Sequence, residues 1–155
     1  MAGSLNWDLE EQEGGQRVKL AGEITETANL GELLARLSGS VLLDTAGVRR
    51  INSTGVREWV EFVRGARGKG ITLVLERCSV AFVHQLNLNA IFRGQSAVRS
   101  VYAPYFCPQC NAEHALLIDL DSAPRIEPEP PCPTCGSAME FDDLPDKYLA
   151  FHAPH

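Results

Sequence analysis

Four of the five cysteines in this 155-residue chain form two closely spaced pairs. Each pair has the pattern Cys-x-x-Cys: Cys107 with Cys110, and Cys132 with Cys135, with residues 111–131 between the pairs. A tight Cys-x-x-Cys turn directs two thiolates at one ion, and two such turns supply the four ligands of a tetrahedral Zn²⁺ site. The spacing therefore predicts one structural Zn²⁺ per chain.

Three other uses of these cysteines can be weighed against a structural metal. Disulfide bonds are rare in cytosolic proteins. A thioredoxin-type redox pair follows a strand and opens a helix, whereas four prolines between residues 124 and 131 precede the second pair. A catalytic zinc needs an open coordination position, which four cysteines do not leave. The segment therefore looks like a zinc ribbon, with strands expected at Ala115–Leu120 and Ala138–Phe141.

A second segment that could do chemistry is Ile51–Gly55, which reads Ile-Asn-Ser-Thr-Gly. It lies between an aliphatic run and an amphipathic stretch, so we expect Ser53 and Thr54 at a helix N-terminus. The free N–H groups and the positive end of the helix dipole favour a capping oxygen there, or a phosphate attached to one.

Apolar periodicity predicts the helices that flank this segment. Residues at helical spacing form one apolar stripe before it and another after it: Leu30, Leu33, Leu34 and Leu37, then Val56, Trp59, Val60 and Val63. A third, shorter helix is expected over Val80–Leu86.

Short aliphatic runs between the helices predict the strands. Val41–Leu43 and Ile71–Leu75 are uniformly apolar, which is typical of parallel strands buried on both faces. Further strands are expected at Leu5–Leu9, Val18–Leu20 and Val98–Tyr102. The alternation of strands and helices predicts an α/β fold with a mixed sheet.

The order of these elements resembles the STAS family, the domain shared by anti-sigma factor antagonists and sulfate transporter tails. Val41–Asp44, Ile51–Gly55 and the helix from Val56 match the family's strand, its Asp-Ser-Ser-Gly-type loop and its second helix. Arg17–Thr25 looks like the family's early strand and Gly-Glu-Ile turn. Later matches are Gly70–Leu75 and Phe82–Phe92. The resemblance covers residues 17–102 and implies a STAS-like mixed sheet with packed helices.

The resemblance also implies a regulatory site. Ser53 aligns with the serine that a partner kinase phosphorylates in the family and a phosphatase restores, and Thr54 is the second candidate acceptor. Asn52 and Thr25 stand where the family has acidic residues, which fits either relaxed kinase recognition or a domain that only binds. The implied partners are a serine protein kinase that is also an anti-sigma factor, a phosphatase, or a sensory scaffold. From the residues alone, Ser53 could equally be only a helix cap.

Charge divides the chain into two parts. Residues 1–104 carry 12 Lys or Arg and 11 Asp or Glu, whereas residues 105–155 carry 2 and 9, a net charge of −7. We therefore expect a STAS-like domain over 1–103 and a zinc-ribbon-like domain over 104–155, with an acidic linker at 121–131 and a short C-terminal tail. Two cations in the second part cannot neutralise several phosphates, which argues against nucleic acid as a partner.

Composition and the remaining motifs exclude several other classes. The apolar fraction of 45% indicates a folded chain, and no apolar run is long enough to cross a bilayer. The polar, acidic N-terminus lacks a secretory pattern, so a cytoplasmic protein without membrane contact is expected. No Ser/His/Asp arrangement, phosphate loop or metal-hydrolase motif is present, and enzyme activity is not expected. Cys78 is expected in the core, and His84 and His114 at the surface.

Two functions therefore remain open. The first is a regulatory interaction module whose 52–55 loop docks a protein, switched by phosphorylation at Ser53, with the ribbon as a second interaction surface. The second is an adaptor without phosphorylation, in which the ribbon makes the main contact. A nucleic-acid-binding ribbon protein is a distant third. A short helix within 142–151 is expected to pack on the ribbon or on the first domain.

Overall fold

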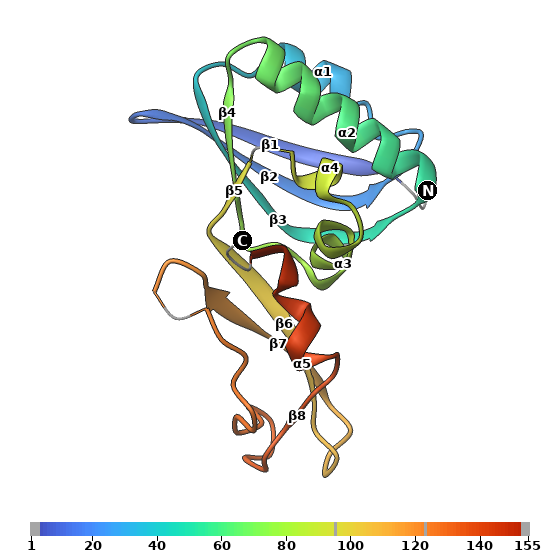
Figure 1. The fold of residues 1–155 in the computed structure, drawn as a ribbon, viewed down its shortest axis with the longest axis vertical. Coiled ribbons are helices and arrows are strands. Elements are labelled where there is room, and N and C mark those ends of the chain that lie inside the picture. Colours follow the sequence, from blue (N-terminus) through green and yellow to red (C-terminus); the bar gives the residue numbers. More distant parts are fainter. Residues whose placement is uncertain (1–3, 95, 123, 153–155) are drawn as a thin grey trace.

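The computed structural model describes residues 4–94, 96–122 and 124–152, which form a mixed α/β fold with two sheets (Figure 1). The first sheet has the strand order β1-β2-β3-β4-β5: Leu5–Gln12, Gly15–Ile24, Ser40–Ile51, Thr72–Glu76 and Ala97–Val98. Strands β1 and β2 form an antiparallel hairpin, and β2 to β5 pair in parallel. The predicted mixed sheet is confirmed.

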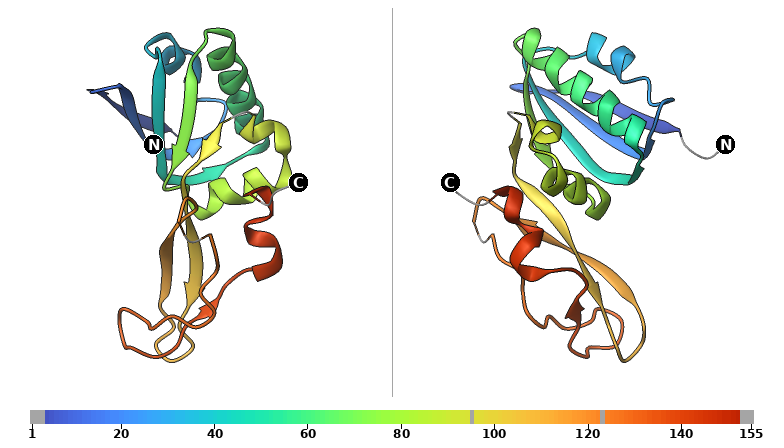
Figure 2. Two further views of the ribbon diagram at one scale, coloured as in Figure 1. Left: turned by 60° about the vertical axis from the view of Figure 1, so that its left-hand side comes forward. Right: turned by 45° about the vertical axis from the view of Figure 1, so that its right-hand side comes forward.

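Helices α1 to α4 connect these strands and lie on one face of the sheet (Figure 2). Their bounds are Leu30–Ala35, Ser53–Gly68, Val80–Leu88 and Ala90–Arg93. The longest, α2, turns one apolar side to the core, where Trp59, Phe62 and Ala66 are buried. After the helix, Gly70 adopts a left-handed conformation with φ of 73° that leads into β4.

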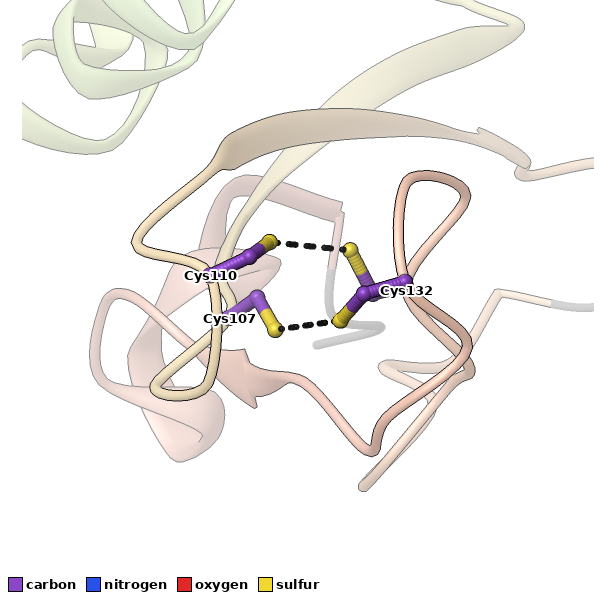
Figure 3. A group of neighbouring side chains, drawn as sticks. Cys107, Cys110 and Cys132 are labelled. Atoms are coloured by element: carbon purple, nitrogen blue, oxygen red, sulfur yellow. Dashed lines mark hydrogen bonds between the residues drawn. The ribbon is translucent and has the colours of Figure 1, made fainter.

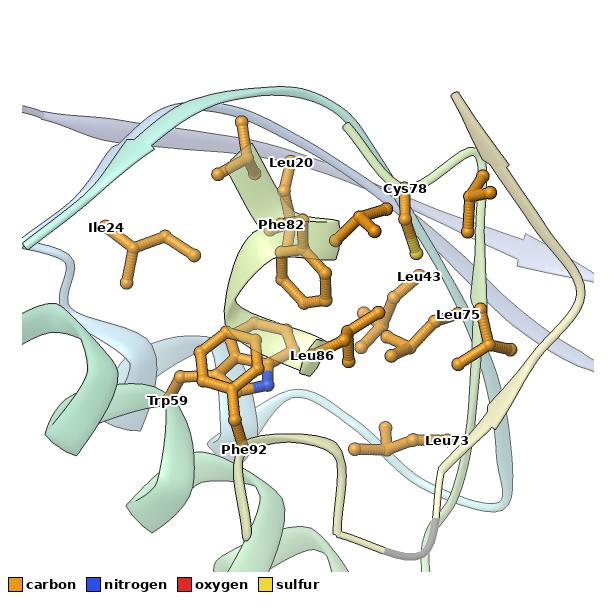
Figure 4. Packing of buried hydrophobic residues seen from close by; sticks show 14 of the residues in the cluster. Leu20, Ile24, Leu43, Trp59, Leu73, Leu75, Cys78, Phe82, Leu86 and Phe92 are labelled. Atoms are coloured by element: carbon orange, nitrogen blue, oxygen red, sulfur yellow. The ribbon is translucent and has the colours of Figure 1, made fainter. Parts of the chain in front are cut away.

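An aromatic cluster joins the helices at the centre of this core (Figure 4). The ring of Trp59 lies 5.1 Å from Phe82 of α3, edge to face, and 5.8 Å from Phe92 of α4, stacked. Buried aliphatic side chains from the strands, such as Leu43 and Leu75, complete the core. Burial of these large rings helps to hold α2 against the sheet.

Among the residues that the structure describes, no helix covers the other face of the first sheet. Val41 and Leu43 of β3 are buried, but Leu42 and Val74, which point to the opposite face, are only half-buried, and Lys19 is exposed. The prediction that these strands were buried on both faces was therefore wrong. Long charged side chains take the place of helices on this face.

The second sheet has the order β7-β6-β8, with bounds Glu113–Asp119, Ser100–Phe106 and Glu140–Phe141. Strand β6 is antiparallel to both neighbours. The two ribbon strands expected from the sequence correspond to β7 and β8, although β8 has only two residues.

The strand expected over Val98–Tyr102 is divided between the two sheets. Val98 ends β5 in the first sheet, whereas β6 begins at Ser100 in the second, inside the residues expected for the first domain. Arg99 joins them, because its N–H donates to Leu75 O and its carbonyl accepts from Leu120 N. The buried side chains of both sheets form one continuous hydrophobic cluster.

The chain ends in a short helix, α5 (Pro145–Tyr148), followed by a 3₁₀ turn, Ala150–His152. Together they confirm the predicted C-terminal helix. Figure 2 shows this segment returning from the second sheet toward α3 of the first. Among the described residues, no helix combines the length and apolar character needed to cross a membrane.

Candidate metal centre and the loop before α2

The four paired cysteines come together at the far end of the second sheet (Figure 3). The Sγ atoms of Cys107 and Cys135 are 3.5 Å apart, those of Cys110 and Cys132 are 3.8 Å apart, and all four lie within 4.8 Å of one another. Zinc–sulfur bonds of about 2.3 Å in a tetrahedron give sulfur–sulfur edges of about 3.8 Å. The thiols therefore form a cage of the right size for a metal ion.

The two Cys-x-x-Cys turns have the same backbone geometry. In the first, Cys107 O accepts from Asn111 N at 2.8 Å and Cys107 N donates to Ala112 O at 2.9 Å. In the second, Cys132 makes the equivalent bonds with Gly136 N and Ser137 O, at 2.8 and 2.7 Å. Each turn thus presents its pair of thiols in the same way.

Both turns contain one residue in the left-handed region. Gly136 has φ of 80° and Asn111, its counterpart, has φ of 61°. Glycine adopts this conformation without strain, and asparagine is one of the few other residues that tolerates it. The sequence pointed to Gly136 only, although Asn111 follows Cys110 in the same way.

Hydrogen bonds favour the thiolate forms of the second pair. The backbone and side chain of Ser137 lower the pKa of the Cys135 thiol to about 6. Burial raises the pKa of Cys132, but the backbone N–H groups of Cys135 and Thr134 outweigh it and lower the pKa overall. Since thiolates are the metal-binding form, these bonds favour metal binding at Cys132 and Cys135. At Cys110 the backbone of Ala112 lowers the pKa, but burial and hydrogen bonds with the other three thiols outweigh it and raise this pKa to about 12.

The surroundings of the cage fit a closed, structural site. Cys107 and Cys132 are buried, whereas Cys110 and Cys135 are exposed. His114 is the second residue of β7, and its Nε2 lies 3.2 Å from Thr134 Oγ1. It does not belong to the four-cysteine group. Four sulfur ligands fill a tetrahedral ion, so the centre can hold metal without leaving it a position for substrate.

The second candidate site lies between β3 and α2, at the side of the first sheet and away from the end of the second sheet that holds the metal cage (Figure 1). Asn52 is the N-cap of α2, because its side-chain oxygen accepts from Gly55 N at 2.7 Å. The interpretation of Ser53 as the N-cap was therefore wrong. Ser53 is instead the first residue of the helix and is exposed, and Thr54 beside it is half-buried.

Gly55 brings this loop against the end of β2. A Cβ atom added to Gly55 would lie 1.8 Å from Ile24 O, a distance that no side chain can occupy. Asn52 N also donates to Ile24 O, at 3.3 Å. The first turn of α2 and the end of β2 therefore fix the backbone on both sides of Ser53 and Thr54.

Thr25 does not face the surface beside Ser53. Its side chain is buried and its Oγ1 lies 3.0 Å from Oγ1 of Thr27. The carboxylate at this place comes from Glu26, whose Oε2 accepts from the Asn52 amide at 3.2 Å. A backbone hydrogen bond within Glu26 and the Asn52 amide lower the pKa of this carboxyl.

Two arginines add positive charge near the loop. Arg49 and Arg50, at the end of β3, both pair with the buried Glu23, at 3.6 and 3.3 Å. Sequence reasoning missed these residues and Glu26. The available signal was the pair of adjacent arginines immediately before the hydroxyl-rich loop.

The remaining predicted positions behave as expected. Cys78 is fully buried, and burial raises the pKa of its thiol to about 12. His84 lies on the outer side of α3, with Nε2 2.8 Å from Asp143 Oδ2.

Comparison of the chain with protein-family models and with curated proteins found no match.

Proposed function

We propose that this chain is a non-enzymatic regulatory module that binds other proteins through the 52–55 loop, resembling the anti-sigma factor antagonists of the STAS family. The supporting observation is the exposed Ser53 at the start of α2, in a loop fixed by the Asn52 cap and the Gly55 contact. Because Asn52 supplies the cap, a change at Ser53 alters the surface without removing the bond that begins the helix.

A phosphate at Ser53 is the proposed switch. It adds about −1.5 to −2 charges at pH 7, beside the positive end of the α2 dipole. The helix tolerates this charge, and a partner that has bound the neutral loop loses affinity. The proposed partners are a serine protein kinase that also acts as an anti-sigma factor, a phosphatase, or a sensory scaffold.

The second part of the proposal is one structural Zn²⁺ held by Cys107, Cys110, Cys132 and Cys135. The sulfur spacing and the matched backbone turns support zinc, since four thiolates in a tetrahedron are its typical structural site. The centre stabilises an acidic second sheet that offers a separate protein-binding surface.

The alternative is a cytoplasmic adaptor in which Ser53 is never phosphorylated and the second sheet makes the main contact. The absence of acidic residues at positions 52 and 25 favours it, whereas Glu26 beside Asn52 restores one negative charge to the loop. Both proposals describe a binding protein, so the effect of charge at Ser53 separates them.

The test compares the affinities of wild type, Ser53→Ala and Ser53→Asp for one partner purified from the native cell. The switch predicts that Ser53→Ala binds as wild type does and that Ser53→Asp binds at least about tenfold more weakly, or roughly 1.4 kcal/mol. Ser38→Asp, which adds the same charge at an exposed position before the start of β3, at the other end of that strand from the 52–55 loop, is the matched control. Equal affinities for all four proteins would reject the switch and leave the adaptor.

A further inference from the structure

The C-terminal segment, defined here as residues 143–152, connects the metal-bearing end of the molecule to α3 of the first sheet (Figure 2). It begins two residues after β8 and contains α5 and the 3₁₀ turn. At its start, Asp143 Oδ2 lies 2.8 Å from Nε2 of His84 on α3. This contact joins α3 to a residue 59 positions later in the chain.

Tyr148 anchors this segment. Its side chain is 2% exposed, and its hydroxyl donates to Tyr102 O on β6. The ring lies 5.4 Å from Phe141 of β8 and 6.2 Å from His84, in both cases edge to face. A single aromatic side chain thus packs between β6, β8 and α3.

Side chains of α3 and α4 hold the backbone of the same segment. Asn87 of α3 donates to Tyr148 O at 2.7 Å and accepts from Phe151 N at 2.9 Å. Arg93 of α4 donates to Phe151 O at 2.9 Å. Because these bonds use main-chain groups, they depend on the path of the segment and less on its sequence.

The segment also follows the last cysteine of the metal cage closely in the chain. Between Cys135 and the segment, the chain pairs with β6 over only two residues, Tyr105 with Phe141 and Phe106 with Glu140. On either side of that short strand, Met139 N donates to Pro130 O and Asp142 N donates to Pro104 O. So short a strand is weak alone, and a bound ion that joins the two Cys-x-x-Cys turns supplies the missing constraint.

We propose that metal occupancy controls the seating of residues 143–152 on α3. With the ion bound, the segment packs beside His84 and Asn87 of α3 and its Tyr148 ring is buried. Loss of the ion loosens β8, breaks the bonds of the segment to α3 and exposes the Tyr148 ring. The energetic link is mutual, since a ligand that binds only the ordered state stabilises that state. This inference rests on the proposed metal site and is independent of Ser53.

Amide hydrogen exchange of the full chain, read by mass spectrometry, tests the link in zinc-loaded and chelator-treated samples whose zinc content is measured. Removal of zinc should accelerate exchange at least about tenfold in residues 143–152 and in α3, while the α2 peptide changes less than about twofold. Unchanged exchange at either the segment or α3 in a zinc-free sample overturns the inference. A chain that takes up no zinc overturns both it and the proposed metal site.

A variant separates the segment from the metal. Asn87→Ala removes two of the bonds to the segment and leaves the cysteines intact, so zinc content should stay at one per chain while residues 143–152 exchange at least about tenfold faster. Gln85→Ala, which shortens another amide side chain on α3, is the matched control. Equal acceleration by both variants would assign the effect to the stability of α3 and reject the proposed seating of residues 143–152 on Asn87.

Discussion

At the residue scale, the loop before α2 divides two tasks between neighbouring side chains. Asn52 closes the helix start by accepting from Gly55 N, and its amide also binds Glu26. Ser53 is left exposed at the first helical position. A modified Ser53 therefore alters the surface charge while the cap that defines the helix remains in place.

The first prediction concerns this division. Asn52→Ala should lower the free energy of unfolding by about 1 kcal/mol, because Gly55 N loses its capping acceptor. Ser53→Ala should change it by less than about 0.5 kcal/mol, as is usual for an exposed position. Urea denaturation of both variants measures the difference. A larger loss for Ser53→Ala than for Asn52→Ala would contradict the assignment of the cap.

Gly55 supplies the second prediction. Gly55→Ala should destabilise the protein by about 2 kcal/mol or more, because its Cβ would overlap Ile24 O and force α2 away from β2. Gly68→Ala is the matched control, since the same helix leaves open space at that position. Thermal unfolding should show a lower midpoint for the first variant only, and equal midpoints would refute the close contact.

Some residue roles could be predicted from the sequence and others could not. The spacing of the four cysteines was sufficient to place them in one cluster, because each turn is local. Asn and Ser are nearly equivalent as helix caps, so the sequence alone could not show that Asn52 is the residue whose side chain accepts from the first turn of α2. Glu26 also could not be placed, because it reaches Asn52 across 26 positions of sequence.

At the element scale, a charged network covers the helix-free face of the first sheet and joins it to the second. Asp44 of β3 is buried, and its Oδ2 lies 3.3 Å from Arg17 of β2 and 2.9 Å from Arg77 after β4. Arg77 also donates to the Tyr102 hydroxyl on β6, at 2.9 Å. Arg77 therefore links the two sheets through side-chain bonds.

The third prediction is that Asp44→Asn lowers the free energy of unfolding by about 2 kcal/mol or more, because two guanidinium groups lose a buried counter-charge. Glu61→Gln is the control: its pair with Arg64 is 3.9 Å long and exposed on both sides, so the loss should stay below about 1 kcal/mol. Chemical denaturation compares them. Similar losses for both would show that the Asp44 network does not bind the sheets together.

Elements with local signals were predicted more accurately than their partners. Apolar periodicity located the helices and the parallel strands, because these patterns repeat within a few residues. It could not assign β6 to the second sheet, since that depends on β7 and β8, which lie later in the chain. The uncovered face was missed for a similar reason: Leu42 and Val74 look like core residues until the charged neighbours on adjacent strands are known.

At the scale of the whole molecule, charge and architecture follow the same division. Apart from most of β6, the second sheet and its turns belong to residues 105–155, which carry a net charge of −7, and four thiolates around one Zn²⁺ would add about −2. Such a surface repels phosphates and suits a basic protein surface. One continuous core joins this acidic part to the first sheet.

The fourth prediction follows from that charge. Generic DNA or RNA should not bind measurably at physiological salt, because the acidic part lacks the cations that would release phosphate counter-ions. Fluorescence anisotropy with labelled duplex and single-stranded probes measures it. A salt-sensitive complex at low micromolar protein would contradict the charge argument and favour a nucleic-acid-binding ribbon.

In the proposed metal site, Cys107, Cys110, Cys132 and Cys135 hold one zinc ion and fill its coordination. X-ray absorption at the zinc edge of the purified protein tests it most directly. We expect one zinc per chain, surrounded by four sulfur atoms at about 2.3 Å, with no nitrogen or oxygen neighbour. A zinc-free protein, or a zinc with nitrogen or oxygen ligands in place of any cysteine, would contradict the account.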